Sequence, residues 1–134
     1  MRVGIVIQLC LLLPAQASAQ GSQLPVAGLY SGTGTDVTGR IQHDKFARYM
    51  TPKDFQNMIV GSGLCSNKQV SVGSYSFDAT SSCDTPDRDL RGILTHRYGT
   101  FSPRSFTMTE DFRLFGKTIT TTKEFELVRA MPGR

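Results

Sequence analysis

The chain contains two histidines, His43 and His96, which are the first candidates for acid–base chemistry. Asp44 follows His43, so a carboxylate that could orient an imidazole is its direct neighbour. A hydrolase would also need a nucleophile brought to the histidine by the fold, and no Ser or Thr stands out from the many present. Because histidines are more often surface groups or satisfied by hydrogen bonds, a hydrolase that uses His43 or His96 is the least favoured function.

Cysteine chemistry is the second candidate. Cys10 lies inside an apolar N-terminal run, which leaves Cys65 and Cys83 as an isolated pair. In an oxidising compartment such a pair predicts a structural disulfide, worth about 3 kcal/mol for a loop of this length. A redox or nucleophilic thiol would favour a Cys-x-x-Cys spacing or an activating partner, and that spacing is absent. With both cysteines in a disulfide too few zinc ligands remain, so we expect neither a metal site nor a cofactor.

Three carboxylates, Asp84, Asp87 and Asp89, lie close together and could serve Ca²⁺, which prefers several oxygen ligands on a flexible loop. However, Arg88 lies among them, and the Asp-x-Asp-x-Asp-Gly pattern is missing. Asp and Pro86 are also common turn residues. We interpret the segment as a solvated turn, with calcium binding as the minor alternative.

The N-terminus has the features of a secretory signal peptide. A basic residue is followed by an apolar run, 3–13, and then by small residues at Ala17 and Ala19. The run is shorter than the roughly 20 apolar residues that a transmembrane helix needs. We therefore expect cleavage between Ala19 and Gln20, export to the periplasm, and no membrane-spanning segment in the mature protein.

The remaining chain has the length of one domain. Its basic residues are scattered among acidic ones, with a net charge of +4 for the whole chain, whereas nucleic-acid binders cluster such charge on one face. We expect no nucleic-acid partner, and a monomer. The predicted organisation is a signal peptide (1–19), a flexible lead (20–27), a single β-rich domain (28–129) and a C-terminal tail (130–134).

One short helix is predicted at 51–60. Thr51 can cap it, Pro52 suits its first turn, and Phe55, Met58 and Ile59 have the spacing of one apolar helix face. Glycines follow and end the helix.

Most other segments alternate apolar and polar residues, as strands with one solvated face do. In the clearest case Phe106, Met108, Phe112 and Leu114 point one way and polar residues point the other. The fold class is therefore α+β, mostly β: an antiparallel meander sheet, open or curled into a half-open barrel, with one short helix. The expected strands are 28–35, 41–50, 69–72, 74–82, 90–98, 105–114 and 118–129, with turns at 36–40 and 83–88.

Aromatic and methionine side chains are numerous enough to line a ligand cavity, although a domain of this size needs most of them for its core. Phe115 is out of phase with Phe112 and Leu114, so we expect it to be exposed beside a turn at Gly116. The candidate ligand or partner surface comprises Tyr30, Phe77, Phe106, Met108 and Phe115.

Several short motifs occur in the order typical of a family of small exported bacterial proteins. They are the segment Pro25-Val26-Ala27-Gly28-Leu29-Tyr30, the helix start Thr51-Pro52-Lys53-Asp54, and then Cys65, Phe77 and Cys83. Over most of the mature chain the sequence resembles the domain of unknown function 3617 family.

Two departures from this family concern cysteines. The family's Cys before the helix start is Met50 here, and its Gly-x-Cys-like tail is replaced by 131–134. The joint loss of the outer cysteines is what a separate pairing of the inner two, Cys65 and Cys83, would allow. The resemblance implies a compartment and a fold but no reaction. The leading hypothesis is a non-enzymatic periplasmic protein that binds an apolar ligand or an envelope partner; the alternative is a purely structural or interaction protein of the envelope.

Overall fold

The computed structural model describes residues 24–61, 64–85 and 89–131. The predicted signal peptide and its cleavage site between Ala19 and Gln20 lie outside the described residues. The elements are β1 (Gly28–Thr35), β2 (Ile41–His43), β3 (Arg48–Met50), α2 (Pro52–Val60), β4 (Cys65–Val72), β5 (Ser76–Thr85), β6 (Leu90–Ser102), β7 (Ser105–Leu114) and β8 (Lys117–Ala130).

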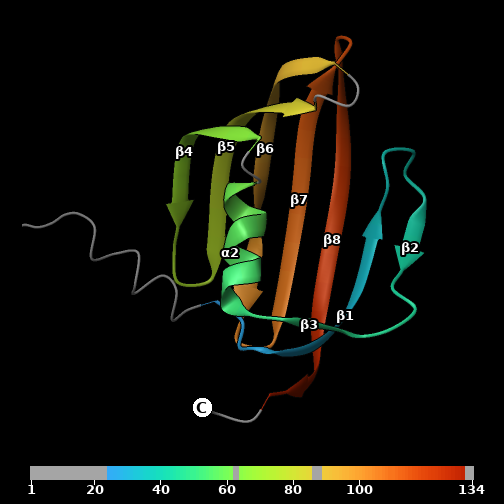
Figure 1. Cartoon of the computed structure of the whole chain (residues 1–134), viewed down its shortest axis with the longest axis vertical. Helices are drawn as coiled ribbons and strands as arrows, with labels where there is room; N and C mark the ends of the chain where they lie inside the picture. Colours follow the sequence, from blue (N-terminus) through green and yellow to red (C-terminus); the bar gives the residue numbers. More distant parts are fainter. Residues whose placement is uncertain (1–23, 62–63, 86–88, 132–134) are drawn as a thin grey trace, which may run out of the picture.

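The described strands form one antiparallel sheet of eight strands (Figure 1). Its order is β2-β1-β8-β7-β6-β5-β4, and β3 also pairs with β1. From β4 to β8 each strand pairs with the next, as a meander does. The sheet ends at β4 and β2 without closing, so the prediction of a meander with one short helix is confirmed in its open form. We call the face that carries α2 the inner face and the opposite one the outer face.

The helix begins and ends where its residue types predict. Thr51 Oγ1 accepts a hydrogen bond from the Asp54 amide at 3.3 Å, and the Asp54 carboxylate accepts one from the Thr51 amide at 2.8 Å. This reciprocal capping satisfies two amides that the first turn would otherwise leave unpaired. Gly61, with φ of 84°, ends the helix. Phe55 and Ile59 are buried against the sheet, as their spacing predicts.

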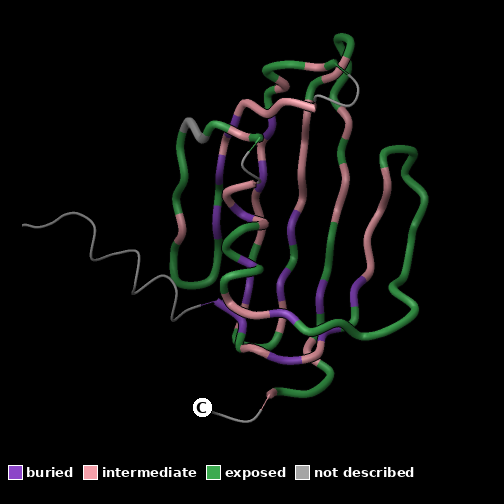
Figure 2. The backbone as a smooth tube through the Cα atoms, in the orientation of Figure 1, coloured by how far each residue is buried: buried purple, intermediate pink, exposed green. Residues whose placement is uncertain are grey.

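The core lies between α2 and the sheet, and Phe55 is at its centre. The Phe55 ring centroid is 5.1 Å from that of Tyr30, 4.9 Å from Phe106 and 6.0 Å from Phe125. Phe77 stacks on Phe106 at 5.3 Å. Figure 2 shows that buried backbone positions concentrate around the helix, whereas the strand ends beyond it are mostly intermediate or exposed. The other core residues are Leu24, Met50, Ile59, Ala79, Phe101 and Met108.

The predicted single strand 41–50 is wrong. It consists of the short strands β2 and β3, separated by a bend, and its side chains are exposed up to Met50. Asp44 donates its amide to the Gly32 carbonyl at 2.9 Å and pairs with Arg48 at 3.0 Å, so the chain turns here. The poor alternation of apolar residues in this segment is consistent with the break.

The expected lead 20–27 is described from Leu24 onward, and this part packs on the domain. Leu24 and Pro25 are buried, and the Val26 amide donates to the Pro103 carbonyl at 3.0 Å. The Tyr30 hydroxyl donates to the Val26 carbonyl. Burial raises the pKa of Tyr30 to about 12, because the charged phenolate is disfavoured there.

Candidate functional site

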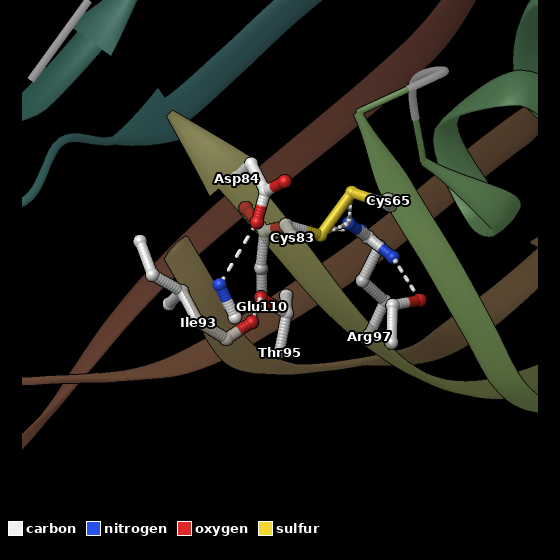
Figure 3. Close-up of a disulfide and its surroundings, with 9 residues drawn as sticks. Cys65, Cys83, Asp84, Ile93, Thr95, Arg97 and Glu110 are labelled. Carbon is white, nitrogen blue, oxygen red and sulfur yellow. Dashed lines mark hydrogen bonds and ion pairs between the residues drawn. A yellow bond between two sulfur atoms is a disulfide. The ribbon is translucent and has the colours of Figure 1, made fainter. Parts of the chain in front are cut away.

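A disulfide joins Cys65 of β4 to Cys83 of β5, as the sequence predicts (Figure 3). The two residues lie opposite each other in the antiparallel register, with Cα atoms 4.0 Å apart. The disulfide therefore fixes the edge strand β4 to the sheet close to the end of α2.

Arg97 of β6 extends its guanidinium beneath this disulfide on the inner face (Figure 3). Its Nη2 lies 3.4 Å from both Cys65 Sγ and Cys83 Sγ. Its Nη1 donates to Ser81 Oγ at 3.1 Å, and its Nε donates to Glu110 Oε2 at 2.9 Å. The side chain is only 5% exposed, so these partners replace the water that the charge has lost.

The C-terminal end of α2 lies over the same guanidinium. A β-carbon at Gly61 would lie 2.8 Å from Arg97 Nη2, and the φ of 84° there also favours glycine. The last turn of α2 contains no basic residue of its own. Because a helix C-terminus carries partial negative charge, Arg97 supplies the cation that stabilises it.

Beyond the end of α2 the inner face is uncovered and hollowed. A cavity of about 420 Å³ next to the disulfide adjoins one of about 380 Å³ farther along the strands, and the two share Thr85, Ile93 and Phe112. We call this continuous hollow the groove. The side chains that line its outer part are Val37, Thr85, Leu90, Ile93, Phe112, Leu114 and Ile119.

The groove exists because the strands are much longer than the helix. The nine residues of α2 span about 14 Å, whereas the thirteen residues of β6 span about 43 Å. The apolar alternation of β7 continues past the helix to Phe112 and Leu114. These side chains therefore face a hollow rather than a packed partner.

The inner end of the groove is polar. Lys123 of β8 lines it and also a smaller adjoining hollow of about 190 Å³, which Met58 shares. Lys123 has no ion pair within the part of the chain that the structure describes. One end of the groove is thus apolar, and the other offers an ammonium group beside the Arg97–Glu110 ion pair.

His96 lies on the outer face and belongs to a polar network. Its Nε2 is 2.9 Å from Asp78 Oδ2, and its ring is 4.7 Å from that of Tyr98. The Tyr98 hydroxyl donates to Asp111 at 3.2 Å, which raises the pKa of Tyr98, and Thr120 donates to the same carboxylate at 2.6 Å. Among the described residues no hydroxyl hydrogen-bonds to His96, so the network has no nucleophile in place.

His43 is exposed on β2 and does not pair with the neighbouring carboxylate. Its Nδ1 lies 3.1 Å from Thr33 Oγ1, whereas Asp44 binds Arg48. The two histidines lie on different strands, β2 and β6, and the structure does not bring them together. The imidazole–carboxylate pair considered from the sequence does not form at His43.

The acidic turn is only partly described, since Asp87 lies outside the described residues. Asp84 accepts a hydrogen bond from the Gly92 amide at 2.9 Å and lies 3.8 Å from Arg91. The described residues contain no cluster of three or more His, Cys, Asp or Glu that could hold a metal ion.

The residues predicted to form an apolar ligand or partner surface do not lie together on one surface. Tyr30, Phe77 and Phe106 are buried in the core, and Met108 is buried there while also lining the groove. Phe115 is exposed at the β7–β8 turn, as expected. The sequence did not identify Ile93 as a groove residue, because Gly92 before it interrupts the alternation of apolar and polar residues along the strand.

No protein-family model matches this chain, and neither a curated protein nor a solved structure does so. Within the described ranges, no helix has the length and hydropathy of a transmembrane span.

Proposed function

We propose that this protein is a non-enzymatic carrier that holds an apolar ligand in the groove. The observation that supports this most directly is the uncovered apolar inner face beyond α2, where Ile93, Phe112 and Leu114 line a hollow. The two adjoining volumes fall within the range of about 300–1,000 Å³ typical of ligand pockets. An acyl chain or another elongated apolar group fits such a lining.

We place the protein in the periplasm, after removal of residues 1–19. The order of basic residue, apolar run and small residues supports export, and the Cys65–Cys83 disulfide is compatible with an oxidising compartment. The resemblance to the domain of unknown function 3617 family supports the same location.

Two neighbouring residues of β6 provide a matched test of the groove. Ile93 lines the groove, whereas Leu94 is exposed on the outer face. A carboxylate at the groove position places a charge in an apolar lining, which is costly to desolvate. We expect Ile93→Glu to weaken binding of a fluorescent fatty acid at least tenfold and Leu94→Glu to leave it unchanged.

Mass spectrometry of the protein purified from its native compartment would complement this test. Extra mass in the native spectrum that disappears on denaturation would identify the ligand. Equal fatty-acid affinity for the Ile93→Glu and Leu94→Glu variants, together with a bare native mass, would contradict the carrier proposal. That result would favour a purely structural or interaction protein.

A further inference from the structure

The turn between β7 and β8 has an unusual residue at its tip. Leu114 pairs with Lys117, so the turn consists of Phe115 and Gly116 alone. Both have positive φ, 52° and 77°. Turns of this kind favour Asn-Gly, because a bulky side chain is strained in the left-handed region. A phenylalanine at this position is therefore a costly choice for the fold.

The Phe115 side chain is not part of the hydrophobic core that the described residues form. Phe115 is 85% exposed, and the turn forms the upper extremity of the molecule in Figure 1, where Figure 2 colours it as exposed. Strained residues persist mainly where a function needs them. A projecting aromatic ring that contributes nothing to the core points to contact with something outside the protein.

Two cations adjoin the turn in sequence, Arg113 near the end of β7 and Lys117 at the start of β8, and they indicate which partner the turn fits. The Arg113 guanidinium donates a hydrogen bond to the Thr118 hydroxyl at 3.5 Å. Neither Arg113 nor Lys117 forms an ion pair with a described residue. Phenylalanine, like tryptophan and leucine, enters the interfacial region of a bilayer in peripheral proteins, and Lys and Arg are attracted to anionic lipid head groups. An exposed aromatic ring with a cation two residues away on either side suits such a surface. The ring fits the interfacial region, and the cations fit the anionic head groups.

We propose that the β7–β8 turn docks the protein on an anionic lipid bilayer. Phe115 enters the interface while Arg113 and Lys117 bind lipid phosphates. Leu114, directly below the tip, lines the outer end of the groove, so docking brings this end next to the bilayer. The proposal rests on the turn and its charges and does not depend on ligand binding in the groove.

The absence of tryptophan from the chain allows a direct optical test. Phe115→Trp introduces the only indole, and its emission reports transfer from water into the interface. Phe46→Trp is the matched control, because Phe46 is 83% exposed but lies between β2 and β3, far along the molecule from the tip (Figure 1). With phosphatidylglycerol vesicles we expect a blue shift for Phe115→Trp and none for Phe46→Trp. No shift, or an equal shift at both positions, would overturn the proposal; absence of any shift would favour a protein partner.

Vesicle co-sedimentation supplies the affinities. Phe115→Asn should weaken partitioning onto phosphatidylglycerol vesicles about tenfold or more, because it removes the apolar contact. Arg113→Gln and Lys117→Gln should each weaken this partitioning about fivefold, and the protein should bind poorly to phosphatidylcholine vesicles.

Phe115→Asn relieves strain in the turn, so loss of vesicle binding by this variant cannot be ascribed to unfolding. Ile93→Glu should bind vesicles normally, which separates this proposal from that of the groove. Unchanged partitioning of Phe115→Asn would contradict the docking role.

Discussion

At the scale of single residues, Arg97 shows how this small domain accommodates a buried charge. Isolated charges are very costly to bury, and they persist only when partners satisfy them. Here Glu110 supplies the counter-charge, Ser81 accepts a hydrogen bond, and the end of α2 adds partial negative charge. The guanidinium thereby joins β5, β6, β7 and the helix at one point beside the disulfide.

Removal of this charge should expose its role. We expect Arg97→Met to lower the free energy of unfolding by about 2–4 kcal/mol, because Glu110 then remains partly buried without a counter-charge. The Arg97→Met, Glu110→Met double variant should recover much of the loss, since apolar side chains can replace a buried pair. Urea unfolding of Arg97→Met, Glu110→Met, the double variant and the wild type completes the cycle. Additive losses in the double variant would show that the two residues act independently.

Tyr30 should make the domain sensitive to alkaline pH. Its pKa is about 12 in the folded protein and about 10 in an unfolded chain, so the folded state holds the proton more tightly. Its contribution to stability is complete below pH 10 and falls as the pH rises toward 12, because the unfolded state ionises first. Urea unfolding across this range should show a steeper decline for the wild type than for Tyr30→Phe. Parallel declines would contradict the assignment to Tyr30.

At the scale of elements, the conformation of the β7–β8 turn can be made more stable by changing the residue at its tip. Phe115→Asn should stabilise the protein by about 1 kcal/mol, because asparagine adopts a positive φ with less strain than phenylalanine. Thermal unfolding of Phe115→Asn should give a higher Tm than the wild type. Phe46→Asn, a change at an equally exposed site, should shift stability by less than about 0.5 kcal/mol. A lower Tm for Phe115→Asn would show that the ring contributes to the fold.

Elements with strong local signals could be predicted from the sequence, and those set by distant contacts could not. Thr51 and Asp54 cap α2 by side chain–backbone bonds only three residues apart, so the motif alone determines the start. The break at Asp44 depends on a hydrogen bond to Gly32 of β1, a contact between strands that residue patterns do not reveal. The groove depends on how far α2 extends along the sheet, a property of the assembled fold.

At the scale of the whole molecule, a short helix on a long sheet divides the inner face into a core and a groove. The half beneath α2 is packed around Phe55, and the other half presents Ile93, Phe112 and Leu114 to a hollow. Arg97, Glu110 and the disulfide lie at the boundary and belong to both halves. A perturbation of this boundary should therefore affect both stability and the proposed ligand binding.

The disulfide allows that coupling to be tested. Reduction, or the Cys65→Ala, Cys83→Ala double variant, should lower the free energy of unfolding by about 3 kcal/mol, because the unfolded chain gains the freedom of the opened loop. Among the described strands β4 pairs with β5 alone, so its loosening should also widen the groove wall formed by Cys65 and Leu64. We expect the double variant to remain folded and to bind a fluorescent fatty acid several-fold more weakly. Vesicle docking through the distant turn should be unchanged. Loss of stability with full fatty-acid affinity would show that the boundary supports the core alone, and that the ligand lies farther along the strands.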